Sequence, residues 1–313
     1  MQILHGLPSH PPPVRTLLAI GNFDGVHRGH QALISEMKRV ANECRCWSGV
    51  LTFDPHPLAI LAPERPLAVL STLEERMALL SALNLDFAVI YPFTLATAQT
   101  PARLFVSHLS KTINLAQLWV GPDATLGDRQ SGDVAALSAL GEDLGFEVRV
   151  VSSFCMEGGS VRSTRIRTLL QEGDVRTAAR LLGRPFRLTG YTVVALGDGS
   201  APGSSTLSLA VETGRVLPGE GIYAGWLDAD VHHVPAVFGV TPPPNRGRSH
   251  EELRVEVRPV DRDAQFRGQV VSLTFVEQLR RLKDFERAGG LAAQLARDLA
   301  AARRILLKDS EEV

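Results

Sequence analysis

Two histidines beside a glycine carry the clearest chemical signal in this chain. His27 and His30 flank Gly29 just after a turn at residues 21–25, and the apolar residues 17–20 predict a buried strand before that turn. The residues after the turn are typical of a helix, whose N-terminus offers unpaired backbone N–H groups to anions, phosphate above all. Gly29 leaves room for a phosphate, and the imidazoles supply donors. The alternative is a pair of surface histidines at a turn.

A second candidate anion site lies in the sequence VRSTRIRTLL at residues 161–170. Ser163 and Thr164 stand where a helix is expected to begin, so their hydroxyls, the free backbone N–H groups and the helix dipole favour one anion. Arg165 and Arg167 add positive charge close by. An ordinary capped helix would explain the same residues, but the histidine motif upstream favours a phosphate.

The elements that must position these motifs alternate between strands and helices. Further buried strands are predicted at residues 48–53, 87–91, 117–120 and 146–151. Helices are expected from the histidines to about Cys44, at residues 72–83 behind a capping box, at residues 132–144, and at residues 175–183 behind the cap Asp174. This alternation predicts an α/β fold of the Rossmann-like type with a parallel sheet.

The second half of the chain has a different pattern. Short β-like runs are separated by glycine and proline, which suggests a small antiparallel β-barrel. The runs lie at residues 187–196, 206–212, 221–228, 234–240, 252–260 and 269–276. A final helix follows, with Leu291, Leu295, Leu299 and Leu306 on one stripe suited to packing on the barrel. We therefore expect two domains, at residues 1–183 and 184–313.

The sequence GNFDGVHRGH at residues 21–30 resembles the first signature of the bacterial FAD synthetases. That family joins an FMN adenylyltransferase domain to a riboflavin kinase domain in one chain. The histidine element alone is shared with other nucleotidyltransferases, but the segment from Ser163 to Arg167 and the sequence LLGRPF at residues 181–186 also resemble the family. The resemblance implies that His27, His30 and Arg167 are catalytic. It implies that nucleotide or flavin is bound by Gly21, Asn22, Phe23, Asp24, Gly29, Arg162, Ser163 and Thr164.

Two further segments of the first half belong to the same resemblance. Pro55 and Pro57 hold His56 at the carboxyl edge of the predicted sheet, where such folds bind ligands, although a rigid loop explains the prolines equally well. Asp123 matches a polar ligand position of the family. Ala124 and Leu126 replace family aromatics that would stack on a flavin ring.

Arg162 replaces a family serine, in the same segment that carries Ser163. A basic residue that the family often carries nearby is Ser160 here. We interpret Arg162 as a substitute for that charge.

The barrel residues with expected chemistry match the kinase family only in part. Residues 203–208 align with a family motif in which a threonine and an asparagine serve ATP and magnesium; Thr206 is retained and Ser208 replaces the asparagine. Thr206 and Ser208 are thus the candidate Mg²⁺ ligands, although the shorter serine would need an intervening water. Glu256 matches the presumed base for the riboflavin hydroxyl, and an outward-facing carboxylate on a strand is the alternative.

Composition limits the partners and the compartment. With 33 Lys and Arg against 34 Asp and Glu the formal charge is −1, so no overall positive field recruits nucleic acid or an anionic membrane. Three cysteines are too few for a disulfide framework. No apolar segment spans a bilayer and no signal peptide is recognised, so a cytoplasmic protein is expected.

The sequence thus predicts an FMN adenylyltransferase, which makes FAD and pyrophosphate from ATP and FMN with Mg²⁺. Riboflavin phosphorylation by the barrel is expected to be weak or absent. Two alternatives stay open: nucleotidyl transfer to another acceptor, which Ala124 and Leu126 would allow, and a non-catalytic relative that only binds nucleotide or flavin.

Overall fold

The fold is described from a computed structural model, which describes residues 1–65, 67–128, 131–194, 207–242, 253–260, 266, 268–282 and 288–308. Contacts divide the chain into two compact units, Met1–Ser163 and Thr164–Val313. The division lies at the start of a helix, ahead of the boundary expected between residues 183 and 184.

The first unit contains a six-stranded sheet in which all neighbouring strands are parallel, in the order β1-β4-β3-β2-β5-β6. Its strands are β1 (Gln2–His5), β2 (Thr16–Ile20), β3 (Trp47–Asp54), β4 (Phe87–Pro92), β5 (Leu115–Val120) and β6 (Glu147–Val150). Its helices are α1 (Arg28–Cys44), α2 (Pro57–Leu61), α3 (Leu73–Ser81), α4 (Leu95–Ala98), α5 (Ala102–Thr112) and α6 (Val134–Leu144), with a short 3₁₀ turn η1 (Asp24–Val26) and a small hairpin of β7 (Cys155–Met156) and β8 (Gly159–Ser160). The predicted α/β class is confirmed.

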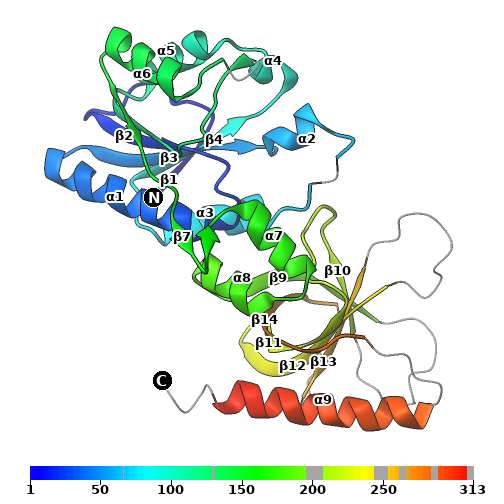
Figure 1. The fold of residues 1–313 in the computed structure, drawn as a ribbon. Coiled ribbons are helices and arrows are strands. Elements are labelled where there is room, and N and C mark those ends of the chain that lie inside the picture. The colour runs from blue at the N-terminus through cyan, green and yellow to red at the C-terminus, as the bar shows by residue number, and fades with distance from the viewer. Residues whose placement is uncertain are drawn as a thin grey trace. The chain divides into compact units, whose positions relative to one another are not determined.

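Helices cover both faces of this sheet, α1 and α3 on one side and α5 and α6 on the other (Figure 1). The sequence explains why, because successive side chains of a strand point to opposite faces. In β2, Leu17 and Ala19 join the core under α1 and α3, whereas Leu18 and Ile20 join the core under α5 and α6. A continuous apolar strand such as β2 is thus the expected pattern for a sheet buried on both faces.

The second unit is a closed six-stranded antiparallel barrel in the order β10-β13-β12-β11-β14-β9. Its strands are β9 (Phe186–Val194), β10 (Leu207–Val211), β11 (Gly221–Ala229), β12 (His232–Thr241), β13 (Arg254–Pro259) and β14 (Val270–Arg280). Phe275 fills the interior, with its ring centroid 5.0 Å from that of Phe238 and 5.4 Å from that of Tyr223. The predicted barrel is confirmed.

Three helices accompany the barrel, α7 (Ser163–Gln171), α8 (Val175–Leu182) and α9 (Ala288–Lys308). Asp174 caps α8 as expected, with its side chain accepting from the Thr177 backbone N–H. On α9, Ala302 and Leu306 pack against outward-facing residues of β11 and β12. Arg280 of β14 and Asp298 of α9 form an ion pair at 2.7 Å that is nearly buried. The described helices include none that is both long and apolar enough to cross a membrane.

Candidate active site

The histidine motif lies at the carboxyl end of β2, a central strand of the sheet. The chain leaves β2 through a turn in which Phe23 has a φ of 49° and Gly25 a φ of 74°. Helix α1 then begins at Arg28 with His27 as its N-cap. β2 lies between β3 and β5, so the motif lies where the strand order reverses, the usual ligand position in such sheets.

The two imidazole rings are stacked face to face. Their centroids lie 3.7 Å apart with an interplanar angle of 14°, and the ring of Phe23 meets His30 edge-on at 5.1 Å. Gly29 makes this packing possible, because a Cβ there would meet the His27 ring at 3.2 Å and the carbonyl oxygen of Val161 at 3.3 Å. The glycine therefore leaves open the space between the motif and the segment before α7.

A backbone hydrogen bond determines which nitrogen of His27 is the acceptor. The backbone N–H of His30 donates to Nδ1 of His27 at 3.3 Å, so Nδ1 is an acceptor and the proton of the neutral ring belongs on Nε2. The pKa of His30 lies well below 6.5, chiefly because of burial and then because of its electrostatic interactions with His27 and Arg76. The ring of His30 is therefore neutral at neutral pH.

Asp24, the acidic residue of the turn, forms its hydrogen bonds within the protein. Asp24 is buried, and its carboxylate accepts the backbone N–H groups of Leu70 and Ser71 at 2.9 and 3.1 Å. The Ser71 hydroxyl accepts from the N–H of Gly25 at 3.0 Å. Phe23 is buried as well. The expected contacts of Phe23 and Asp24 with nucleotide would therefore have to come from their backbone.

Ser163 is joined to this turn, because its hydroxyl donates to the carbonyl oxygen of Asp24 at 3.0 Å. It also begins α7, as the sequence predicts. Thr164 is exposed on the first turn of that helix and Arg167 is half-buried on the next. Arg162 and Asp123 form an exposed ion pair at 2.7 Å, so two predicted site residues meet in the first unit.

A cavity of about 700 Å³ opens beside Gly21 and Asn22 at the carboxyl edge of the sheet. This volume suits a small-molecule ligand. His56, Asp123, Ala124 and Leu126 also line it, so these predicted residues meet around one space. His56 additionally caps α2, with Nδ1 accepting from the N–H of Leu58 at 3.2 Å.

Two aromatic residues of this cavity were missed by the sequence analysis. Phe53, at the end of β3, and Phe93, just after β4, line the cavity with their ring centroids 5.4 Å apart. The available signal was an aromatic residue at the end of one predicted strand and another two residues beyond the end of the next. The cavity is thus lined in part by aromatic side chains even though positions 124 and 126 are aliphatic.

The barrel brings two predicted residues together across neighbouring strands. Ser208 on β10 and Glu256 on β13 are direct register partners, and both are half-buried. Their neighbours Leu207, Leu209, Val255 and Val257 are buried, so the pair lies on the outer face. Thr206 lies outside the described residues.

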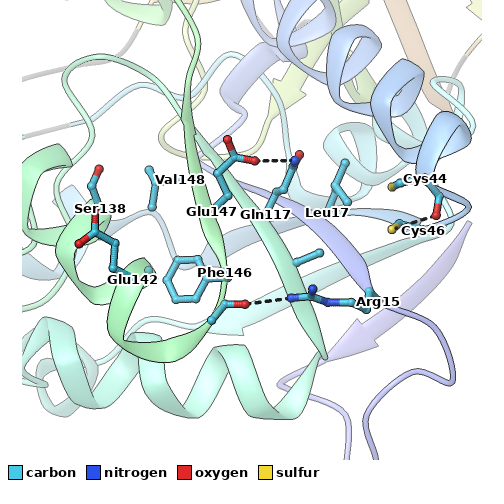
Figure 2. Close-up of a pocket in the computed structure, with 13 residues that line it drawn as sticks. Arg15, Leu17, Cys44, Cys46, Gln117, Ser138, Glu142, Phe146, Glu147 and Val148 are labelled. Carbon is cyan, nitrogen blue, oxygen red and sulfur yellow. Dashed lines mark hydrogen bonds between the residues drawn. The ribbon is translucent and has the colours of Figure 1, made fainter.

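A second cavity, of about 840 Å³, lies at the opposite edge of the sheet, by the amino ends of β2, β5 and β6 (Figure 2). Arg15 donates there to the carbonyl oxygens of Leu115 and Gly145 at 2.9 and 3.0 Å, and Glu147 accepts from Gln117 at 2.9 Å. None of the predicted site residues lines this cavity. It is thus separate from the candidate active site.

Two family models match consecutive parts of the chain, FAD synthetase at residues 10–165 and riboflavin kinase at residues 182–306. The bifunctional riboflavin kinase/FMN adenylyltransferase of Escherichia coli K12 is 30% identical over 96% of this chain and 95% of its own length. The enzyme of the same name from Pseudomonas fluorescens is 31% identical over 97% of this chain and 98% of its own length.

A solved structure from Streptococcus pneumoniae, titled a macrolide-efflux protein, matches with a TM-score of 0.80 and 25% identity over 96% of this chain and 98% of its own. Enzymes that use ATP as these families do generally need a divalent metal. The predicted family, the synthesis of FAD and the adenylyltransferase class are confirmed by these matches. The chain therefore belongs to the family of bifunctional riboflavin kinases/FMN adenylyltransferases.

Proposed function

We propose that the histidine pair and the cavity beside it form the site at which this chain transfers AMP from ATP to FMN. The observation that carries the assignment is the stacked pair of His27 and His30 at the N-terminus of α1. This arrangement directs ring and backbone N–H donors to phosphate oxygens. The family of the chain supports ATP, FMN and riboflavin as its substrates.

The reaction is a direct displacement at phosphorus. A phosphate oxygen of FMN forms a bond to the α-phosphorus of ATP, the bond from that phosphorus to the bridging oxygen breaks, and pyrophosphate leaves. Such a step depends on orientation and on charge stabilisation more than on covalent catalysis. His27 donates from Nε2, and His30 acts as a second neutral donor to the transferring and leaving phosphates.

The remaining predicted residues bind the substrates. Ser163, Thr164 and Arg167 are proposed to hold the outer phosphates, as the start of a helix with a nearby arginine suggests. The ion pair of Arg162 with Asp123 supports a role of both at the edge of the cavity. Gly21, Asn22, Gly29 and His56 would contact nucleotide or flavin.

The aromatic contact of the flavin ring is assigned to residues of the first cavity. Phe53 and Phe93 line that cavity, and their ring faces suit stacking on an isoalloxazine ring. Ala124 and Leu126 line the same space with aliphatic groups. FMN is thus a suitable acceptor without aromatic residues at those two positions.

Mg²⁺ would reach the site bound to ATP. The donors around the histidine motif are imidazole nitrogens and backbone N–H groups, which suit phosphate oxygens rather than a hard cation. The described residues also contain no group of three or more acidic, histidine or cysteine side chains able to hold a metal. The motif therefore does not fit a protein-bound magnesium.

In the barrel, we propose that Glu256 accepts the proton of the riboflavin hydroxyl during phosphorylation. Oxygen donors suit Mg²⁺, and the Ser208 hydroxyl beside Glu256 would hold the ion, together with Thr206. The short serine side chain favours a slow kinase.

We also propose that the boundary between the two domains lies between residues 183 and 184. A cytoplasmic location is proposed as well, because three free cysteines favour it.

Incubation with ATP, Mg²⁺ and either FMN or riboflavin tests this function. Separation of the products should show FAD and pyrophosphate from FMN, and a slower appearance of FMN and FAD from riboflavin. A chain that makes no FAD from FMN and ATP would contradict the assignment of the histidine site.

A further inference from the structure

A buried arginine lies behind the histidine motif. Arg76 is on α3 and is only 3% exposed, although arginine side chains are rarely so buried. Its Nη1 donates to the hydroxyl of Thr52 at 3.0 Å and to the carbonyl oxygen of Phe53 at 3.2 Å. Its Nε is buried and has no hydrogen-bond partner within the described ranges. Burying a guanidinium costs free energy, so its position needs an explanation.

Hydrogen bonds connect this arginine to the turn before His27. The Thr52 hydroxyl that accepts from Arg76 donates in turn to the carbonyl oxygen of Asn22 at 3.0 Å. Asn22 lies in the turn between β2 and η1. The chain from Arg76 through Thr52 to Asn22 thus joins α3 and the end of β3 to the segment that sets the direction of the motif.

A second set of bonds joins the same two elements. The Asp24 carboxylate accepts the backbone N–H groups of Leu70 and Ser71, just ahead of the N-cap of α3. The turn is therefore linked to α3 twice, once through Thr52 to Arg76 and once through Asp24 to the residues just before the helix. Since α3 carries Arg76, the side chain has little freedom to move relative to the motif.

The charge of Arg76 faces a small set of ionisable groups. Burial, the largest effect, lowers the pKa of Arg76, while Asp24 and Asp54 favour its charged form. Its positive charge in turn helps to lower the pKa of His30, after the larger effects of burial and of His27. The ionisable groups that influence one another here are thus Arg76, Asp24, Asp54, His27 and His30.

We propose that Arg76 is a positioning residue for AMP transfer, which holds the turn before the histidines through Thr52 and places a fixed positive charge behind the pair. This inference rests on the proposed function of the histidine site. Arg76 acts through the turn and the histidines rather than by contact with substrate. It keeps His30 neutral as pH falls and keeps the donors of the motif in one place.

Three variants separate these two effects. Arg76→Met removes the charge and the hydrogen bonds, Arg76→Lys keeps the charge, and Thr52→Val keeps the charge but removes the hydroxyl between Arg76 and Asn22. Arg39→Met is the matched control, because Arg39 is an exposed arginine of α1 that pairs with Glu36 and Glu43. The readouts are kcat and KM for FAD formation from FMN and ATP across pH, with thermal unfolding of each variant.

The expected results differ between the variants. Arg76→Met should lower kcat about tenfold or more, because small misplacement of reacting groups is costly, and should move the acid limb of the kcat profile to higher pH. Arg76→Lys should keep the wild-type acid limb with a lowered kcat. Thr52→Val should lower kcat severalfold without moving the limb. Arg39→Met should change neither.

Three results would overturn the inference. They are a wild-type kcat profile for a folded Arg76→Met, an Arg76→Lys limb displaced to higher pH, and an unchanged kcat for Thr52→Val. If Arg76→Met does not fold, the lysine and valine variants decide the question alone. Failure of the proposed function is a different result, since wild-type protein would then form no FAD from FMN.

Discussion

The two units assemble their expected chemistry by different means. In the first, His27 and His30 lie within one helical turn, so local backbone geometry alone brings the rings together. In the barrel, Ser208 and Glu256 are remote in sequence and face each other only because β10 pairs with β13. A slip of one residue in that pairing would turn Ser208 toward the interior. The comparison shows that a local motif depends on a turn, whereas a cross-strand pair depends on the register of the whole barrel.

The largest expected effect separates the two activities. His30→Ala should lower FAD formation from FMN at least about a hundredfold, the scale of losing a transition-state donor, while any riboflavin phosphorylation continues. The measurement is turnover with each flavin, and circular dichroism checks the fold. His108→Ala, an exposed histidine of α5, is the control. An unchanged rate of FAD formation would remove His30 from the mechanism.

The second prediction concerns the barrel pair. Ser208→Asn should raise riboflavin phosphorylation about tenfold, because a longer oxygen ligand orients magnesium better, and it should leave AMP transfer unchanged. FMN formation is best followed in a His30→Ala background, where the product accumulates. Ser208→Ala should move the rate in the opposite direction. Fast phosphorylation by the unaltered barrel would show that serine suffices.

A smaller change tests the packing of the motif itself. Gly29→Ala would bring a Cβ within 3.2 Å of the His27 ring, so the ring must shift by a few tenths of an ångström. We expect a roughly three- to tenfold loss of AMP transfer with little loss of stability. Gly121→Ala is matched to it, since a Cβ there meets nothing within 4 Å. Equal rates for both alanine variants would mean that the ring position is not critical.

The smallest effect is on stability in acid. The pKa of His30 is lowered by folding, so the unfolded chain binds more protons, and stability present above pH 6.5 is lost as pH falls below it. The loss approaches about 1.4 kcal/mol per pH unit for one group. The barrel histidines His232 and His233 are exposed. Urea unfolding of wild type and His30→Gln between pH 7 and 5 should converge toward acid, and parallel curves would contradict this assignment.

Much of the fold follows from the sequence because its signals are local. The capping box of Thr72 and Glu75 starts α3, Asp174 caps α8, and Gly145 ends α6 in a left-handed conformation. The edge strand β1 received no assignment, since its four residues are mostly exposed and form no apolar run. Helix α5 also received none, although Phe105, Val106 and Leu109 are buried with helical spacing.

In the candidate site, too, local sequence predicted some features, and others depended on the tertiary structure. The sequence indicated which residues could bind phosphate, since His27, His30 and Ser163 stand at helix starts that their own neighbours define. It could not indicate that Asp24 and Phe23 are directed inward, or that Phe53 and Phe93 line the cavity. Those facts depend on the order of the strands.

By itself, the sequence of this protein determined most of its elements, its two kinds of domain and its phosphate-binding candidates, because caps, turns and hydrophobic periodicity act over a few residues. Only the tertiary structure decided that Arg76 lies behind the histidine pair, that Asp123 meets Arg162, and that Ser208 faces Glu256. Each of these contacts joins residues far apart in the chain. Their positions follow from strand order and register, which are set by packing of the whole unit rather than by any local segment.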